Sequence, residues 1–174
     1  FGGIFAGLLV GNKNRNEGFI VQVFKPIVST LVLPYLMRLK LDPKKLVNAT
    51  AITLVDGLSS KMKVLTDTVF GKLGKNVTYV GGGAGFYNLT HNPCIFDNNG
   101  IYKDALYICI VESEAKLAVK HGWRKLQGPF YANKSNENIL SQLDNDSAFN
   151  IYKYVIEQEE NLMLYKEDFF MFAK

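Results

Sequence analysis

A run of β-branched and aromatic residues near the middle of the chain passes directly into a cluster of glycines. Residues 76–85 read N-V-T-Y-V-G-G-G-A-G, so the run Val77–Val80 is followed by four glycines in five positions. The pattern predicts a buried strand that ends in a loop of unusual backbone freedom, because glycine adopts positive φ without steric cost. Such a loop presents backbone N–H groups to a ligand, or it lets two elements cross closely.

The glycine cluster matches neither of two common nucleotide-binding motifs. A dinucleotide fingerprint, G-x-G-x-x-G, needs glycine at the sixth position and a helix after it, and this chain has Phe86 there. A P-loop needs lysine and a hydroxyl residue after its last glycine, but Gly85 is followed by Phe86 and Tyr87. Both motifs are therefore excluded.

Composition predicts a compact domain and excludes several partner classes. The chain has 174 residues, of which 48% are hydrophobic and 21% charged, enough for one core. The net charge of +4 comes from lysines dispersed among acids, so we expect no nucleic-acid partner. The most apolar run, Pro26–Met37, contains two prolines and is shorter than the ~20 residues that span a bilayer, so we expect no membrane segment. Two cysteines without CxxC spacing favour a cytoplasmic protein.

The first half of the chain predicts a parallel strand–helix–strand unit. A strand is expected at Phe19–Phe24 and a short helix at Tyr35–Leu39. The unit itself comprises a strand at Ala49–Val55, an amphipathic helix at Lys61–Leu73 and the strand that ends at Val80. Ligands gather at the carboxyl ends of strands in such sheets, which is where the glycines follow.

The second half predicts an antiparallel meander and a last helix, Ser147–Glu157. Asn98-Asn99-Gly100 is typical of a hairpin turn, and strands are expected at Ala105–Val111, Lys116–Leu126, Phe130–Lys134 and Ile139–Leu143. Alternation with period two places His121 and Trp123 on the core face of their strand. The predicted class is therefore α+β, a mixed β-sheet system with helices packed on the sheet.

Several motifs together resemble one known family. His121-Gly122-Trp123-Arg124, Gly128-Pro129, and the later Asn138, Leu143-Asp144, Ala148 and Tyr152 follow the order and spacing of the FIST domain (F-box and intracellular signal transduction). The Gly81–Gly85 run and Asp56-Gly57 also suit this family. The resemblance covers residues 1–174 as a single domain fragment, about 1–160 resembling the N-terminal half and 161–174 the start of the next segment.

The resemblance implies a sensory region of signalling proteins that binds small molecules such as amino acids, with no catalytic set. It also implies that the remainder of the FIST region lies outside this chain, and we expect no cofactor and no metal. The sequence departs from the family pattern at Phe86, where an acid is usual, at Lys125 and at Glu137. Phe86 matters most, because an ammonium group held by that acid would lose its partner.

The predicted ligand site combines the glycine loop with the strand that carries the histidine and the tryptophan. The backbone N–H groups, the imidazole and the flat indole suit a small polar molecule with a carboxylate. The site residues are Gly81, Gly82, Gly83, Ala84, Gly85, His121 and Trp123.

Two other functions stay open. An enzyme would need Asp56, His121 or Cys109 within hydrogen-bond reach of one another, whereas a structural interaction module would use the glycines for packing alone. Cys109 lies in an apolar strand, so we expect its side chain to pack in the core rather than to act as a nucleophile. His91 and Cys94 are two residues of metal-ligating type, but a site needs three or four, so they predict a polar turn.

The chain starts at Phe1 and closes on Phe169–Phe172. We expect a fragment of a longer protein. We also expect it to form a homo-oligomer, because the aromatic tail would otherwise expose apolar surface.

Overall fold

The computed structural model describes residues 1–33, 46–120, 122–136 and 139–165. The chain divides into two compact units, Phe1–Ala118 and Val119–Lys174, each described by itself below. The tail Phe169–Phe172 and the expected helix Tyr35–Leu39 lie outside the described residues. No helix among the described residues combines the length and the apolar character needed to cross a membrane.

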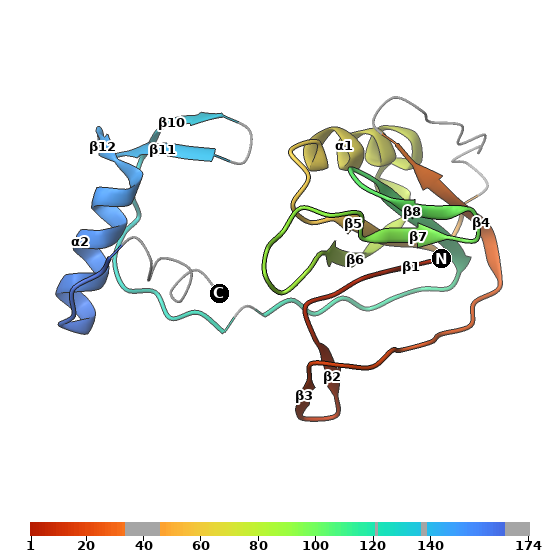
Figure 1. Ribbon diagram of the computed structural model, residues 1–174. Coiled ribbons are helices and arrows are strands. Elements are labelled where there is room, and N and C mark those ends of the chain that lie inside the picture. Colours follow the sequence, from red (N-terminus) through yellow and green to blue (C-terminus); the bar gives the residue numbers. More distant parts are fainter. Residues whose placement is uncertain (34–45, 121, 137–138, 166–174) are drawn as a thin grey trace. The chain divides into compact units, whose positions relative to one another are not determined.

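The first unit is built on a four-stranded mixed sheet with the order β4-β9-β5-β6 (Figure 1). Strands β5 and β6 are parallel, whereas β9 is antiparallel to both β5 and β4. Helix α1 and the short 3-10 turn η2 connect β5 to β6, so the predicted parallel strand–helix–strand unit is confirmed. The bounds are β4 Pro26–Val32, β5 Ala49–Asp56, α1 Met62–Leu73, η2 Gly74–Asn76, β6 Thr78–Ala84 and β9 Leu106–Glu112.

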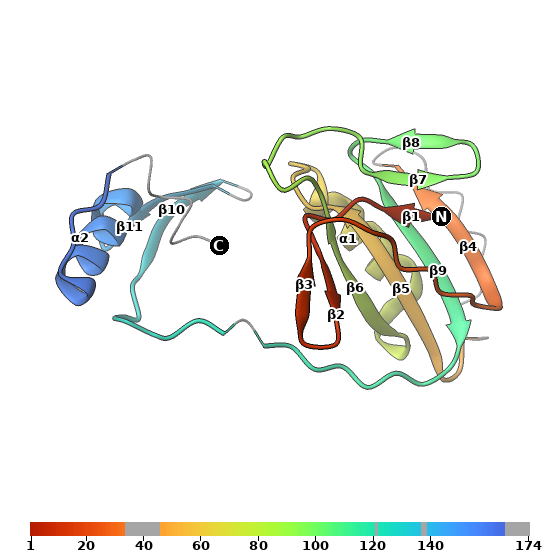
Figure 2. The ribbon, with the colours of Figure 1, turned by 60° about the horizontal axis from the view of Figure 1, so that its bottom comes forward.

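Helix α1 covers one face of this sheet (Figure 2). Its apolar residues recur at helical spacing, and Leu65, Val69 and Leu73 are all buried. They join Ile108 and Ile110 of β9 in one core cluster. Tyr107, directly before Ile108, belongs to a second cluster, because successive side chains of a strand point to opposite faces.

A small sheet with the order β1-β7-β8 contributes to this second cluster. Strands β7 (Ile95–Asp97) and β8 (Gly100–Tyr102) form the hairpin predicted at Asn98-Asn99-Gly100, with Asp97 opposite Gly100. Strand β1 (Gly2–Gly3) pairs with β7. Strands β2 (Leu8–Val10) and β3 (Lys13–Arg15) form a separate hairpin.

The second unit contains an antiparallel sheet and a helix. The strands are β10 (Ala132–Asn136), β11 (Ile139–Leu143) and β12 (Asp146–Ser147), and the helix is α2 (Ala148–Glu160). Val155 and Ile156 are its buried residues. The strands and helix confirm the α+β class, although the strands of the whole chain are divided among four sheets.

Two predicted strands are wrong. Residues 19–24 form no strand, and Phe19 is 88% exposed; the edge position beside β9 is taken by β4, which starts at Pro26. The described residues between 116 and 126 also form no strand, and Trp123 is 52% exposed rather than in the core. A nearly continuous apolar run predicted the first of these strands and alternating apolar residues the second, but a strand also needs a neighbouring strand to complete its backbone hydrogen bonds.

The predicted glycine loop is also wrong, because Gly81–Gly83 continue β6 and pair with Thr53–Val55 of β5. At Gly81, φ is +156° and an added Cβ would lie 1.8 Å from the carbonyl oxygen of Thr53. The glycines thus permit close parallel pairing, which is the packing alternative for this run.

Candidate functional site

The sequence-predicted site residues fall in both units. Gly81–Gly83 and Ala84 belong to β6, and the Gly85 N–H donates to the carbonyl of Ile4 over 2.7 Å. Trp123 belongs to the second unit, and His121 lies outside the described residues. The structure therefore does not bring the glycines and Trp123 together within one unit, and their joint site stays a prediction.

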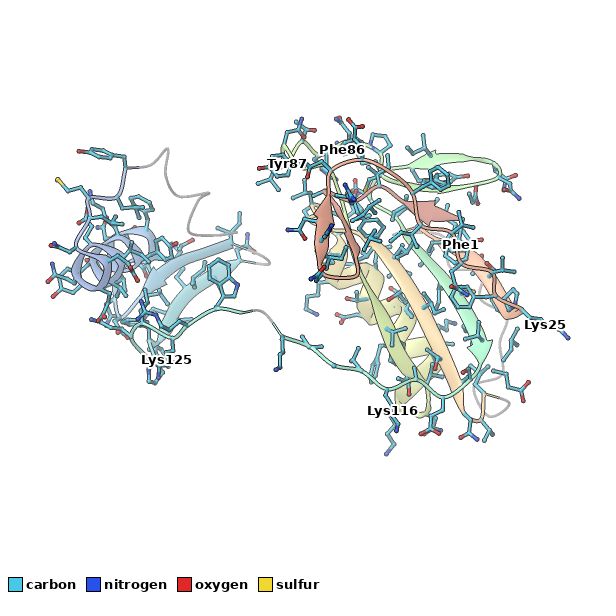
Figure 3. All side chains as sticks on the ribbon, turned by 90° about the horizontal axis from the view of Figure 1, so that it is seen from below. Phe1, Lys25, Phe86, Tyr87, Lys116 and Lys125 are labelled. Carbon is cyan, nitrogen blue, oxygen red and sulfur yellow. The ribbon has the colours of Figure 1, made fainter. Side chains whose placement is uncertain are left out.

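A polar cluster lies instead where β5 ends. Figure 3 shows Phe86 and Tyr87, which directly follow the glycines, at the opposite end of the first unit from Lys116. Asp56 is the last residue of β5 and pairs with Ala84, the last residue of β6. The cluster around Asp56 is thus at the carboxyl edge of the two parallel strands, the edge at which open α/β sheets bind ligands.

The carboxylate of Asp56 is the centre of this cluster and is only 1% exposed. Its Oδ1 accepts the Leu58 N–H at 3.2 Å, and its Oδ2 accepts the Asp104 N–H at 2.8 Å. Nε2 of His91 lies 2.9 Å from the same Oδ2. These contacts provide the hydrogen-bond partners that a buried carboxylate requires.

Asp104 provides a second carboxylate, which is 27% exposed. Its Oδ1 accepts the Ser59 hydroxyl at 2.6 Å and lies 3.6 Å from His91 Nε2. Its Oδ2 lies 3.9 Å from Nζ of Lys61. The cluster thus combines two carboxylates, an imidazole and an ammonium group, and therefore presents charges of both signs.

Backbone contacts hold the segments of the cluster together. The Asp56 N–H donates to the Ala105 carbonyl at 2.9 Å, which fixes the turn that carries Asp104. The Gly57 N–H donates to the Ala84 carbonyl at 2.8 Å, which ties the end of β5 to the end of β6. Asp104 adopts the left-handed conformation with φ 52°, which Asp and Asn tolerate better than most residues.

Neither cysteine has the character of a nucleophile. Cys94 is buried, and burial together with the negative charge and hydrogen bond of Asp56 raises the pKa of its thiol from 9.0 to about 11. Burial also raises the pKa of Cys109, although a hydrogen bond with Ser29 opposes this shift. Both thiols are protonated at neutral pH, and a protonated thiol is a poor nucleophile.

The sequence singles out Asp56 and His91 separately but does not predict that they meet. His91 and Cys94 alone predict a polar turn, because two ligands are too few for a metal site. The fold adds Asp56 and Asp104, and the three side chains have nitrogen or oxygen atoms within 4.8 Å of one another. No local sequence pattern marks Asp104 as a site residue, because its hydrogen-bond partners Ser59 and Asp56 lie 45 and 48 residues away along the chain.

The first unit also has a hollow of about 1070 Å³ on the sheet face opposite α1. Ile52 and Leu54 of β5 line it, together with Phe96 and the N-terminal segments. The hollow is mostly apolar and does not include Asp56, His91 or Asp104. Among the described residues that line it, Glu17 is the one charged side chain and no basic side chain is present, so the hollow offers less for recognising a small molecule with groups of both charges.

Comparison with known proteins identifies the family. The family model of the FIST N domain matches residues 2–146. No curated protein and no solved structure matches the chain. The matched range covers most of the chain and includes Asp56, the glycine run, His91 and Asp104. The chain belongs to the FIST domain family, a family of sensory domains in signal transduction.

Proposed function

We propose that this chain is a ligand-binding sensory module that recognises a small molecule with both a positive and a negative group, such as an amino acid. The observation that carries the proposal is the Asp56–His91–Asp104 cluster, in which a buried carboxylate joins two partly exposed polar side chains at the edge of a parallel strand pair. Clusters of this kind at the carboxyl ends of strands are typical of ligand sites.

The charges of the cluster suit such a ligand. The carboxylate of Asp104 is 27% exposed and accepts the ammonium group, while Nζ of Lys61, whose side chain is 40% exposed, binds the carboxylate of the ligand. Charge-assisted hydrogen bonds of this kind are stronger than neutral ones. The buried carboxylate of Asp56 contacts Nε2 of His91 and holds this imidazole in position.

The end of the glycine run stabilises the backbone next to the site. The Ala84 carbonyl fixes Gly57, so the end of β6 positions the turn that follows Asp56. Phe86 packs against the second core cluster and provides an apolar neighbour for the ligand.

A direct role of Gly81–Gly85 is best tested at Gly82, where an added Cβ meets nothing within 4 Å. Gly82→Val should fold as the parent does, and weaker ligand binding by this variant would support the glycine contact.

The test is a thermal-shift screen of the common amino acids, followed by isothermal titration calorimetry of each hit. We expect at least one amino acid to raise the melting temperature, because a ligand that binds only the folded state stabilises it. Asp104→Asn should weaken binding at least tenfold, while its backbone conformation is retained because Asn also tolerates positive φ. The matched control is Asp67→Asn, an exposed acid on α1 that pairs with Lys63.

Two results would contradict the proposal. If no amino acid raises the melting temperature, the ligand class is wrong, and an interaction module that uses its glycines for packing becomes the better reading. If Asp104→Asn binds a hit as tightly as the parent, the ligand site is elsewhere. The enzyme alternative that uses Cys109 is weaker, because this thiol is buried in β9 and burial raises its pKa.

A cytoplasmic location is part of the same proposal. Cys94 and Cys109 are both free and buried, which suits a reducing compartment.

A further inference from the structure

We propose that Asp56, His91 and Asp104 bind a zinc ion, and that the small ligand completes the coordination of this ion. The inference rests on the proposed function and assigns a second component to the same site. The three donors are one imidazole nitrogen and two carboxylate oxygens, with donor atoms within 4.8 Å of one another. Zinc sites that accept a ligand typically have three protein ligands and one open position.

The spacing of the donor atoms suits a common ion. Two ligand atoms about 2.1 Å from one ion, at tetrahedral or octahedral angles, are roughly 3.0–3.4 Å apart. Nε2 of His91 lies 2.9 Å from Oδ2 of Asp56 and 3.6 Å from Oδ1 of Asp104. Shifts of a few tenths of an ångström would therefore bring these two pairs of atoms to coordination distances, and all three donor atoms lie within 4.8 Å of one another.

The surrounding hydrogen bonds orient both carboxylates. The Leu58 and Asp104 N–H groups hold the two oxygens of Asp56, and the Ser59 hydroxyl holds Oδ1 of Asp104. Such outer contacts are typical of metal sites, because they fix the ligands before the ion binds. A carboxylate oxygen has more than one lone pair, so it accepts an N–H and coordinates an ion at the same time.

The site has one buried ligand and two ligands that solvent can reach. Asp56 is buried, whereas His91 and Asp104 are partly exposed. An ion can therefore enter from solvent and keep one coordination position directed outward. This open position is where a carboxylate or an amine of the ligand would bind.

The net charge of the zinc-loaded site also favours a carboxylate as the group that the ligand presents to the ion. The two aspartates and Lys61 together carry one excess negative charge, with His91 neutral as a zinc ligand must be. A divalent ion changes this to one excess positive charge. The loaded site would then attract an anionic group, such as the carboxylate of an amino acid.

The first experiment measures the ion alone on the whole chain after treatment with a chelator. Calorimetry with zinc chloride should give one ion per chain, and Co²⁺ should give the visible absorption of a tetrahedral site. Asp104→Asn and His91→Gln should each reduce zinc affinity at least tenfold, whereas Asp67→Asn should leave it unchanged. Circular dichroism of each variant checks that the fold is retained. Unchanged zinc affinity in either folded site variant would overturn the inference.

The second experiment separates this inference from the proposed function. An amino acid that raises the melting temperature is titrated into the zinc-loaded protein and into the protein in excess chelator. We expect binding at least tenfold tighter with zinc. Equal affinity in chelator would overturn the zinc inference and leave the proposed function standing. Zinc binding at the cluster with no amino-acid binding in either state would instead overturn the proposed function and the ligand's part in the coordination.

Discussion

The imidazole of His91 lies against the carboxylate of Asp56, with 2.9 Å between Nε2 and Oδ2, although 35 residues separate the two in the sequence. The contact joins the segment after β6 to the end of β5. Asp56 Oδ2 also accepts the Asp104 N–H, so one buried carboxylate organises three separate segments. The stability of the first unit and the geometry of the site should therefore both depend on the side chain of Asp56.

Replacing Asp56 with asparagine should destabilise the first unit. The variant loses the charge and turns one acceptor into a donor that faces a backbone N–H, at a cost of about 1–3 kcal/mol. Urea unfolding followed by circular dichroism measures the change. Asp67→Asn is the control, since this exposed position should change stability by no more than ~0.5 kcal/mol. Equal midpoints for the two variants would show that the contacts of Asp56 contribute little.

The glycines of β6 should differ sharply in their tolerance of alanine. Gly81→Ala would place Cβ 1.8 Å from the Thr53 carbonyl oxygen, so we expect a loss of ~3 kcal/mol or more, or no folding. Gly82→Ala meets nothing within 4 Å and should be close to neutral. Thermal unfolding of both variants compares two neighbouring positions in one strand. A Gly81→Ala protein as stable as Gly82→Ala would contradict the close approach to Thr53.

Both cysteines should be inert in the folded protein. Cys94 is 0% and Cys109 is 1% exposed, and burial raises the pKa of each thiol. Thiolate is the reactive form, so a disulfide reagent at pH 8 should modify neither residue in the native, chelator-treated protein. Both should react in concentrated guanidinium chloride. Rapid modification of one thiol in the native protein would contradict its burial.

Asp97 should titrate at lower pH than an ordinary aspartate. The Asn99 N–H is the main cause of its lowered pKa, with smaller contributions from the Tyr102 hydroxyl and the Gly100 N–H. A lowered pKa means that the ionised carboxylate stabilises the folded hairpin above about pH 4, and that this contribution is lost as the pH falls through the folded-state pKa. Carboxyl chemical shifts recorded by NMR across this range check the direction. A midpoint at or above the ordinary 3.8 would contradict it.

The local pattern of the sequence determined the elements that are held by short-range signals. Apolar spacing predicted the helix that became α1, and the run from Ala49 predicted β5, because a helix face and a buried strand each have a distinct period. Asn98-Asn99-Gly100 predicted the β7–β8 hairpin, because turn conformation is set by a few adjacent residues. The motifs also predicted the family that the family model confirms.

Tertiary structure decided which strands pair and which side chains meet. Residues 19–24 form an apolar run typical of a buried strand, yet the edge strand beside β9 is β4, and the glycines continue β6 because β5 lies alongside. Backbone hydrogen bonds between strands are contacts of long range, and a local pattern does not specify them. The same reason applies to the site. Asp56, His91 and Asp104 lie on three separate segments, and only the folding of β5 against β6 and β9 brings their side chains together.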